Sequence, residues 1–144
     1  RVGDGKNQVS VACVENVAAA HLQAEVALRS SITPNGKAYF INEPEAVNLW
    51  DWINQLLQLA GLPPIRKSVS RRTAWQLGGV LEFIYRVSRI NGEPPMTRFL
   101  AAQLAGSHSY RIDAAQRDFG YSPLIPLDEG LRRLQPELQQ LTRH

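Results

Sequence analysis

The sequence predicts an α/β fold that is mostly helical and contains a few short strands. Two observations support this prediction. Short apolar runs rich in β-forming residues alternate along the chain with longer segments in which apolar residues recur every three or four positions. Glycine, proline and asparagine stand at the ends of several of these segments, where they begin or end helices. The 144 residues have the length of a single domain.

The first part of the chain, residues 1–45, is expected to hold two strands and one helix. The apolar run at 9–14 is predicted as a buried strand. Asn16 is predicted to cap a helix that ends near Arg29. The residues at 38–41 favour a second short strand. Strands this short leave open edges, so the sequence indicates part of a domain and not a whole one.

The second part, residues 46–144, is expected to be mostly helical. Asn48 is predicted to cap its first helix and Gly61 to end it. The remaining elements follow in order: a third strand at 65–69, a long helix at 71–90, a shorter helix at 96–106, an extended piece at 110–112, a helix at 113–119 capped by Asp113, and a last helix from 127 to 140.

The long helix at 71–90 is amphipathic. A helical period places one broad apolar arc opposite a set of charged residues: Leu77, Val80, Leu81, Phe83, Ile84 and Val87 against Arg71, Glu82, Arg86 and Arg89. The longest stretch without charge, 73–81, is far too short for a membrane span. The main interpretation is a core helix. A helix on a membrane surface and a helix that lines an apolar substrate pocket are the alternatives.

The charge and cysteine content exclude some classes of protein. The net charge is +3, yet the basic residues are scattered, and the cluster at 66–72 is interpreted as a solvated loop and helix start. No nucleic-acid partner is therefore predicted. Cys13 is the single cysteine, which excludes an internal disulfide and fits a reducing compartment. Its place in an apolar run predicts a buried, inert thiol.

The usual patterns of catalytic and metal sites are missing from the sequence. Gly3 and Gly5 precede a predicted strand, which is the wrong order for a phosphate-binding loop. The run 107–109, Ser-His-Ser, lacks an orienting carboxylate, which disfavours a hydrolase. The histidines are scattered, which predicts no metal site: His21, His108 and His144. His21 lies on a stripe of small residues and is interpreted as a packed histidine.

Three segments in this order resemble a known family: "GDGKN…VACVENVAAAHLQA", "GKAYFINEPEAVNLWDWINQLL" and "PPMTRFLAAQLAGSHSYRIDAAQRDFGYSPLIPLDEGLRRL". They are similar to the carboxyl half of the extended short-chain dehydrogenases. Within that family they resemble the 3β-hydroxysteroid dehydrogenase/isomerase branch, which includes the sterol-4α-carboxylate 3-dehydrogenases. The resemblance covers nearly the whole chain, and it implies the carboxyl-terminal part of an extended Rossmann-fold dehydrogenase.

The resemblance implies an oxidoreductase that uses NAD or NADP and a Tyr-x-x-x-Lys pair to oxidise a secondary alcohol. No tyrosine of this chain has a lysine four residues on, because Tyr39, Tyr85, Tyr110 and Tyr121 are followed by Glu43, Arg89, Ala114 and Ile125. No catalytic, cofactor-binding or metal-binding residue is therefore predicted here. The cofactor is expected to bind a missing upstream half, and the chain alone is expected to be inactive and to aggregate.

The resemblance also implies which parts face the substrate. Residues 1–45 would complete the Rossmann cofactor domain, and residues 46–144 would form the substrate side. Glu15, Asn16 and His21 match the family pattern V-E/D-N-V-A-x-A-H, in which we interpret Asn16 as a cap. The predicted substrate-binding residues are three apolar ones, Met96, Phe99 and Leu100, and two polar ones, His108 and Tyr110.

The expected substrate is a sterol-like secondary alcohol. The resemblance implies that sugar-nucleotide epimerases of the same superfamily hold the phosphates with a basic residue near the first predicted strand. The segment "NQVSVACVEN" carries no arginine, which disfavours a sugar nucleotide. Two alternatives stay open: a non-catalytic lipid- or partner-binding module, and a fragment of a sugar-nucleotide epimerase or dehydratase. A cytoplasmic protein is expected. Peripheral membrane contact through 71–90 and a homodimer are further open alternatives.

Overall fold

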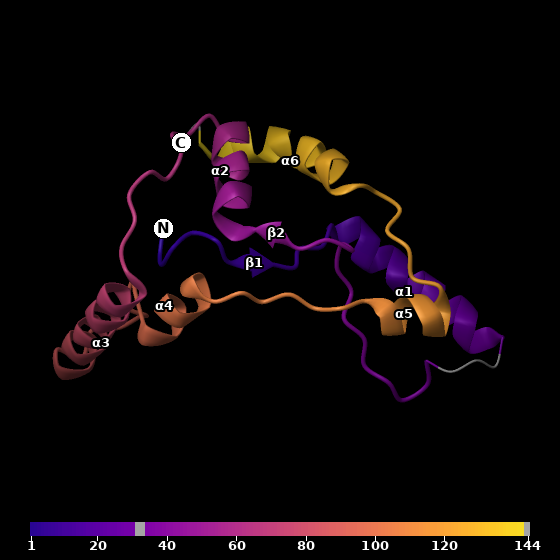
Figure 1. Ribbon diagram of the computed structural model, residues 1–144, viewed down its shortest axis with the longest axis horizontal. Coiled ribbons are helices and arrows are strands. Elements are labelled where there is room, and N and C mark those ends of the chain that lie inside the picture. The colour runs from indigo at the N-terminus through magenta and orange to yellow at the C-terminus, as the bar shows by residue number, and fades with distance from the viewer. Residues whose placement is uncertain (31–33, 143–144) are drawn as a thin grey trace.

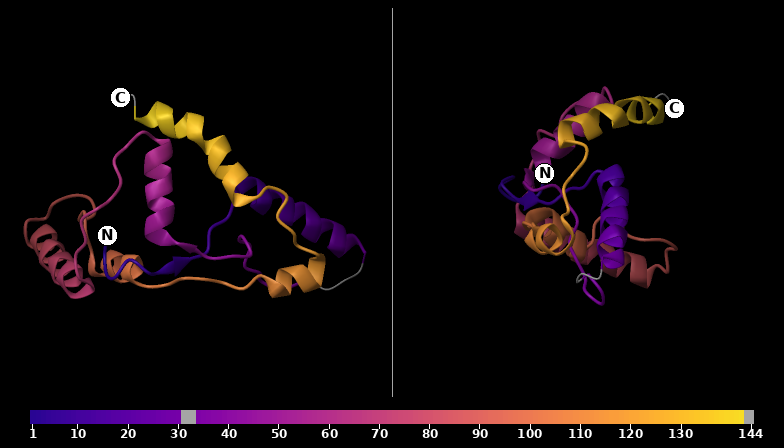
Figure 2. Two further views of the ribbon diagram at one scale, coloured as in Figure 1. Left: turned by 45° about the horizontal axis from the view of Figure 1, so that its top comes forward. Right: turned by 90° about the vertical axis from the view of Figure 1, so that its right-hand side faces the viewer.

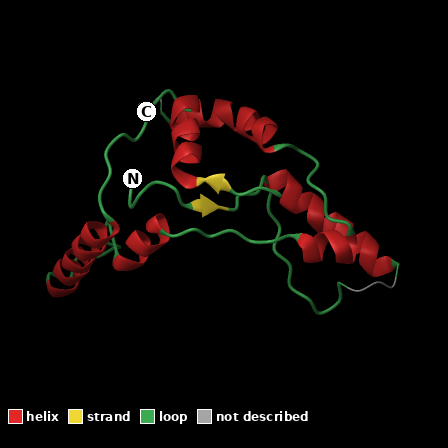
Figure 3. Cartoon of the chain, in the orientation of Figure 1, coloured by secondary structure: helices red, strands yellow, loops and turns green. Residues whose placement is uncertain are grey.

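The computed structural model describes residues 1–30 and 34–142, and within them the chain is mostly helical, as predicted (Figures 1 and 3). The described residues form six helices and one sheet of two strands. The helices are α1 (Val14–Arg29), α2 (Leu49–Leu59), α3 (Arg71–Val87), α4 (Arg98–Ala105), α5 (Asp113–Phe119) and α6 (Leu127–Leu141). The strands are β1 (Gln8–Val9) and β2 (Val47–Asn48).

The two strands join the first part of the chain to the second. They are antiparallel, with Gln8 opposite Asn48 and Val9 opposite Val47. Two isolated parallel bridges extend this junction, one between Val9 and His108 and the other between Val2 and Val69. Segments far apart in sequence therefore meet at the amino-terminal residues, which run through the middle of the molecule (Figure 1).

The strand predictions need correction. The strand predicted at 9–14 is shortened to Gln8–Val9, because the helix already begins at Val14. The residues at 38–41 and at 65–69 form no strand, apart from the single bridge at Val69. A strand requires a neighbour for its backbone hydrogen bonds. Among the described residues, neither segment has a paired strand beside it, so β-forming composition alone does not produce one.

The helix ends follow the sequence more closely. The Asn48 side chain accepts hydrogen bonds from the N–H groups of Trp50 and Asp51, which confirms the predicted cap of α2. Gly61 and Gly120 adopt left-handed conformations after α2 and α5, with φ of 74° and 72°. The predicted cap of α1 is wrong, because the helix begins before Asn16, at Val14, and no side chain caps it.

The buried residues form two small clusters. The helix pairs beside them, α3 with α4 and α1 with α5, lie at opposite ends of the molecule (Figures 1 and 2). At one end, α3 packs on α4, and buried Val2, Trp50, Ala74 and Ala101 form a cluster. At the other end, α1 packs on α5, and the buried cluster consists of Ala20, Ile112, Ala115 and Tyr121. Large exposed hydrophobic side chains outnumber these buried ones, so extended apolar surfaces are available for contact.

The prediction of α3 as a core helix is wrong. Only Ala74 and Gly78 of α3 are buried, and they face α4. A Cβ atom at Gly78 would lie 2.6 Å from the backbone of Thr97 and Arg98, so the two helices touch through their smallest residues. Because this small-residue face makes the contact, the large apolar residues of α3 point elsewhere and stay exposed.

Candidate functional site

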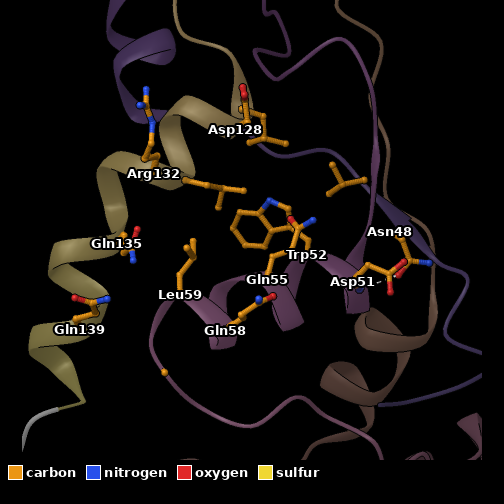
Figure 4. Close-up of a pocket in the computed structure, with 14 residues that line it drawn as sticks. Asn48, Asp51, Trp52, Gln55, Gln58, Leu59, Asp128, Arg132, Gln135 and Gln139 are labelled. Carbon is orange, nitrogen blue, oxygen red and sulfur yellow. Dashed lines mark hydrogen bonds between the residues drawn. The ribbon is translucent and has the colours of Figure 1, made fainter.

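A groove of about 1100 Å³ lies between α2 and α6 (Figure 4). Its apolar lining consists of Val47, Trp52, Leu59, Leu127 and Leu131. Its polar lining consists of Asn48, Asp51, Gln55, Gln58, Asp128, Arg132, Gln135 and Gln139. An apolar wall with several polar groups on its rim is typical of a site for a largely apolar molecule that carries oxygen atoms.

Hydrogen bonds hold the ends of α2 to other parts of the chain. Asn48 caps α2 at one end and donates a hydrogen bond to the carbonyl of Gly5 at 2.8 Å. At the other end, the Thr142 hydroxyl donates to the carbonyl of Ala60 at 3.1 Å and so holds the end of α6 beside the end of α2. The two helices of the groove are therefore linked at their carboxyl ends, and the start of α2 is tied to the amino-terminal loop.

Trp52 is the central side chain of the groove (Figure 4). It also lines a smaller cavity of about 250 Å³ on the side of Cys13 and Gly130. Its indole nitrogen is buried and has no hydrogen-bond partner within the described part of the chain. A buried donor without a partner is costly, so an acceptor atom of a bound molecule would be stabilising there. Arg132 is the one cation among the described residues that line the groove, and it forms an ion pair with Glu129.

A second group of candidate residues lies where β1 meets the segment after α4. The backbone N–H of Gln8 donates to the Ser107 hydroxyl at 3.0 Å, and the N–H of His108 donates to the carbonyl of Gln8 at 2.8 Å. The Tyr110 N–H donates to the Ser10 hydroxyl at 2.9 Å. The structure thus brings together the amino-terminal loop and the segment that the sequence assigned to the substrate side.

Two polar atoms at this junction are buried without partners among the described residues, Oδ1 of Asn7 and Nε2 of His108. The Asn7 amide donates to the carbonyls of Leu104 and Gly106 at 3.3 and 3.2 Å, which leaves its oxygen unused. Buried polar groups normally have partners. The junction therefore combines a tight backbone arrangement with unused hydrogen-bonding capacity.

The five predicted substrate-binding residues lie near this junction, on α4 or just before α4, and none of them lines the groove between α2 and α6. Met96 packs against the α3–α4 core, whereas Phe99 is 72% exposed. Leu100 is also exposed. Tyr110 stacks on Phe40, with ring centroids 4.2 Å apart, and lines a cavity of about 350 Å³.

Sequence reasoning missed the groove because its two helices are separated by the whole segment 60–126. The available signal was the pair of amphipathic helices on either side of that segment, one of which carries Trp52 and the other a row of leucines.

Two predictions about single residues need correction. The Cys13 thiol is only half-buried and donates a hydrogen bond to Oε2 of Glu15 at 2.8 Å. Burial and this hydrogen bond both raise the pKa of the thiol, which keeps it protonated and unreactive near neutral pH. His21 is exposed, not packed, and its Nδ1 is 2.8 Å from the carbonyl oxygen of Val17.

The most strongly shifted carboxyl group, Asp118, has a structural role. Lys37 and the Tyr39 hydroxyl each donate a hydrogen bond to its Oδ2 at 2.9 Å, and Arg117 donates to its Oδ1. These hydrogen bonds, with that of Lys37 the largest contribution, lower the pKa of Asp118 to about 2. The cluster ties the segment after α1 to α5 and lies outside both candidate sites.

Two further properties concern metals and membranes. Residues 1–30 and 34–142 contain no group of three or more histidine, cysteine or acidic side chains placed to hold a metal ion. None of the described helices has both the length and the apolar character needed to cross a bilayer.

Comparison with known proteins identifies relatives over most of the chain. It is 44% identical to the 2-alkyl-3-oxoalkanoate reductase of Stenotrophomonas maltophilia, over 92% of this chain and 40% of that protein. It is 33% identical to 3beta-hydroxysteroid-dehydrogenase/decarboxylase isoform 2 of Arabidopsis thaliana, over 98% of this chain and 26% of that protein. It is 30% identical to a decarboxylating sterol-4-alpha-carboxylate 3-dehydrogenase of Schizosaccharomyces pombe, over 92% of this chain and 39% of that protein. No protein-family profile matches.

Two solved structures share the fold. The crystal structure of gox2253 superposes with a TM-score of 0.63 at 23% identity, over 95% of this chain and 39% of that one. UDP-glucuronic acid 4-epimerase from Bacillus cereus, in complex with NAD, superposes with a TM-score of 0.52 at 17% identity, over 99% of this chain and 34% of that one. The fold is therefore that of part of a Rossmann-type dehydrogenase or epimerase.

The sequence relatives narrow this class. The chain belongs to the extended short-chain dehydrogenase family, in the branch of the 3β-hydroxysteroid dehydrogenases, which confirms the resemblance found in the sequence. The chain spans at most about two fifths of the length of the three relatives described above.

Proposed function

We propose that the chain is part of an NAD(P)-dependent oxidoreductase that interconverts a secondary alcohol and a ketone on a substrate with a large apolar body. The observation that carries this proposal is the similarity to enzymes named as reductases and dehydrogenases over more than nine tenths of the chain. A sterol-like alcohol, as expected from the sequence, is one member of this substrate class.

The names of two relatives point to a narrower substrate. A 2-alkyl-3-oxoalkanoate carries its ketone on the second carbon from the carboxylate. A sterol-4-alpha-carboxylate that reacts at carbon 3 has its oxygen at the same distance from its carboxylate. We therefore propose a β-hydroxy or β-oxo carboxylate on a hydrocarbon body as the substrate.

The described residues do not fit the cofactor. The pyrophosphate of a dinucleotide needs a glycine-rich turn between a strand and a helix. Here residues 10–13 connect β1 to α1 and contain no glycine, and Gly3 and Gly5 precede the strand. We assign NAD or NADP to a part of the protein outside this chain. Residues 46–144 then serve the substrate side, residues 1–45 adjoin the cofactor domain, and the chain alone is inactive.

We propose that the groove between α2 and α6 is the binding site for the apolar body of the substrate. Its volume suits a molecule with a large hydrocarbon body, and the unpartnered indole N–H of Trp52 offers a hydrogen bond to an oxygen atom of the substrate. A second candidate binding site is the set predicted from the sequence, and the separate cavity beside Tyr110 favours it. This set consists of Met96, Phe99, Leu100, His108 and Tyr110.

A panel of substrates tests the proposal on the full-length gene product that contains the chain. With NAD⁺ or NADP⁺ we expect oxidation of a 2-alkyl-3-hydroxyalkanoate, of a 3β-hydroxysterol-4α-carboxylate, or of both, and weaker turnover of the matched alcohols without the carboxylate. Turnover of UDP-glucuronic acid alone would support the epimerase alternative. Binding of the apolar compounds without any turnover would support the non-catalytic module.

A further inference from the structure

A side cavity of about 250 Å³ adjoins the groove between α2 and α6. Three side chains line both spaces, and they are Trp52 of α2 and Leu127 and Leu131 of α6. The other apolar or small residues of the side cavity come from the start of α1 and from α6, and they are Ala12, Cys13, Val14, Gly130 and Leu134. The two spaces therefore share one wall, and Trp52 stands at their border (Figure 4).

The side cavity has an apolar interior. The charged residues on its lining are Glu15, Arg133 and Glu137, and all of them are exposed. Arg133 donates a hydrogen bond to Glu129 at 2.7 Å and lies 3.7 Å from Glu15, so its charge is already balanced. Because the charged groups lie toward solvent, the space inside offers mainly hydrocarbon contacts. Such a lining favours an alkyl chain over a second polar group.

Gly130 and Leu134 set the dimensions of the side cavity. A Cβ atom at Gly130 would lie 3.1 Å from Sγ of Cys13, so α6 approaches the start of α1 closely at this point. The hydrogen bond of the Cys13 thiol to Glu15, at 2.8 Å, holds the sulfur atom in place. Leu134, one turn further along α6, lines the side cavity but not the groove. A larger side chain at this position would therefore reduce the side cavity and leave the groove unchanged.

We propose that the side cavity holds a second hydrocarbon branch of the substrate, while the groove holds the first and longer one. This inference rests on the proposed function, in which the substrate is a β-hydroxy or β-oxo carboxylate on a hydrocarbon body. In such an acid, a branch on the carbon beside the carboxylate leaves the main chain next to the carbons that carry oxygen. Trp52 stands where the two spaces meet, and its buried indole N–H, which has no partner among the described residues, can donate to such an oxygen.

This arrangement distinguishes between the two kinds of substrate in the proposed function. A flexible acid with two alkyl arms can place one arm in each space. A rigid fused-ring body cannot divide in this way, so it would occupy the groove and leave the side cavity empty. Each methylene group that moves from water into an apolar cavity strengthens binding by about fourfold. The side cavity therefore favours the branched acyclic acid, and Leu134 limits the length of the branch that fits.

Binding of carboxylic acids to the full-length gene product, without cofactor, tests this inference. Decanoate has one hydrocarbon arm, and 2-hexyldecanoate has the same arm and a second one on the carbon beside the carboxylate. Isothermal titration calorimetry below the micelle concentrations of the acids gives the two Kd values. We expect 2-hexyldecanoate to bind at least about tenfold more tightly than decanoate. The variant Leu134→Phe should remove most of this difference and leave the Kd of decanoate unchanged.

Matched compounds and variants separate the side cavity from general hydrophobicity. Hexadecanoate is the straight-chain isomer of 2-hexyldecanoate, so Leu134→Phe should leave its Kd unchanged. Leu141→Phe makes the same change on α6 at a side chain that is 77% exposed, and it should affect none of the three acids. Gly130→Ala places a Cβ close to Cys13 and should weaken the binding of 2-hexyldecanoate alone, by less than Leu134→Phe does.

The outcome of the binding experiment is separate from that of the activity assay. The inference is wrong if no acid binds, if the second arm of 2-hexyldecanoate gives no gain over decanoate, or if Leu134→Phe weakens all three acids equally. An enzyme that oxidises the expected alcohols but gives one of these results would reject the side cavity as a binding site and retain the proposed function. The expected binding pattern without any turnover would support the two-branch site and reject the oxidoreductase.

Discussion

Asn16 and Ile125 bind each other through a reciprocal pair of hydrogen bonds. The Asn16 amide nitrogen donates to the carbonyl of Ile125 at 2.8 Å, and its oxygen accepts from the N–H of Ile125 at 2.9 Å. The same oxygen accepts from Leu124, and the same nitrogen donates to Glu43. Asn16 is 0% exposed. It thus ties α1 to the segment that leads into α6 and helps to position the groove.

Replacement of Asn16 by alanine should lower the free energy of unfolding by about 3 kcal/mol. The change leaves the Leu124 and Ile125 backbone groups and the Glu43 carboxylate without partners, and each buried unsatisfied group costs about 1–3 kcal/mol. Urea unfolding of the full-length protein measures the effect. Asn91→Ala, at an exposed loop position, should change stability by less than about 0.5 kcal/mol. Equal effects of the two variants would contradict the assigned role.

Replacement of the two neighbouring glycines of α3 by alanine should change the stability of the protein in opposite directions. Gly78→Ala places a Cβ 2.6 Å from backbone atoms of α4 and should destabilise the protein by about 1–3 kcal/mol. Gly79→Ala meets only the flexible Arg98 side chain, at 3.5 Å, and should stabilise by up to about 1 kcal/mol because alanine favours helix. Thermal unfolding midpoints of the two variants test this pair. A stabilising Gly78→Ala would disprove the close α3–α4 approach.

Asp118 should make the protein sensitive to acid. Its pKa is about 2 in the folded protein against an ordinary value of 3.8, so the unfolded chain takes up the proton first. The stabilisation is complete above about pH 4 and is lost as the pH falls through about 2. Asp118→Asn should flatten the dependence of the unfolding midpoint on pH in this window. An unchanged slope would show that the cluster with Lys37 and Tyr39 does not form.

Cys13 should react slowly with alkylating reagents. Burial and the hydrogen bond to Glu15 raise its pKa, which lowers the fraction of reactive thiolate. Near pH 8 we expect slower alkylation by iodoacetamide than for free glutathione, followed by mass spectrometry. Glu15→Gln removes the carboxylate and its charge, so the thiol pKa should fall and the rate should rise. A wild-type rate above that of glutathione would contradict this assignment.

Local signals in the sequence predicted most of the helices, because the residues that cap or end a helix act within one turn of it. Asn48 before α2 and Gly61 after it lie where the sequence indicated. The strands were predicted poorly, since pairing depends on distant partners such as His108 for Val9. Asn16 was interpreted as a cap from its place before a helix, whereas its partners Leu124 and Ile125 are more than 100 residues away.

The candidate groove depends on the same kind of long-range contact. Its lining residues on α2 and α6 are ordinary members of amphipathic helices, and no spacing in the sequence connects them. The exposed face of α3 shows the reverse case. Its apolar arc was visible in the sequence, but the arc alone does not tell which side packs, and the small residues Ala74 and Gly78 decided it.

The most direct measurement is the KM of the full-length protein for a 2-alkyl-3-hydroxyalkanoate, compared between the wild type and Trp52→Phe. Removal of the indole N–H should raise KM by about 2- to 12-fold, the equivalent of one hydrogen bond of about 0.5–1.5 kcal/mol, with kcat nearly unchanged. Trp75→Phe on α3 should alter neither constant. If KM rises for Tyr110→Phe and not for Trp52→Phe, the substrate binds at the second candidate site, which includes Tyr110. A full-length protein that oxidises no such alcohol would contradict the account.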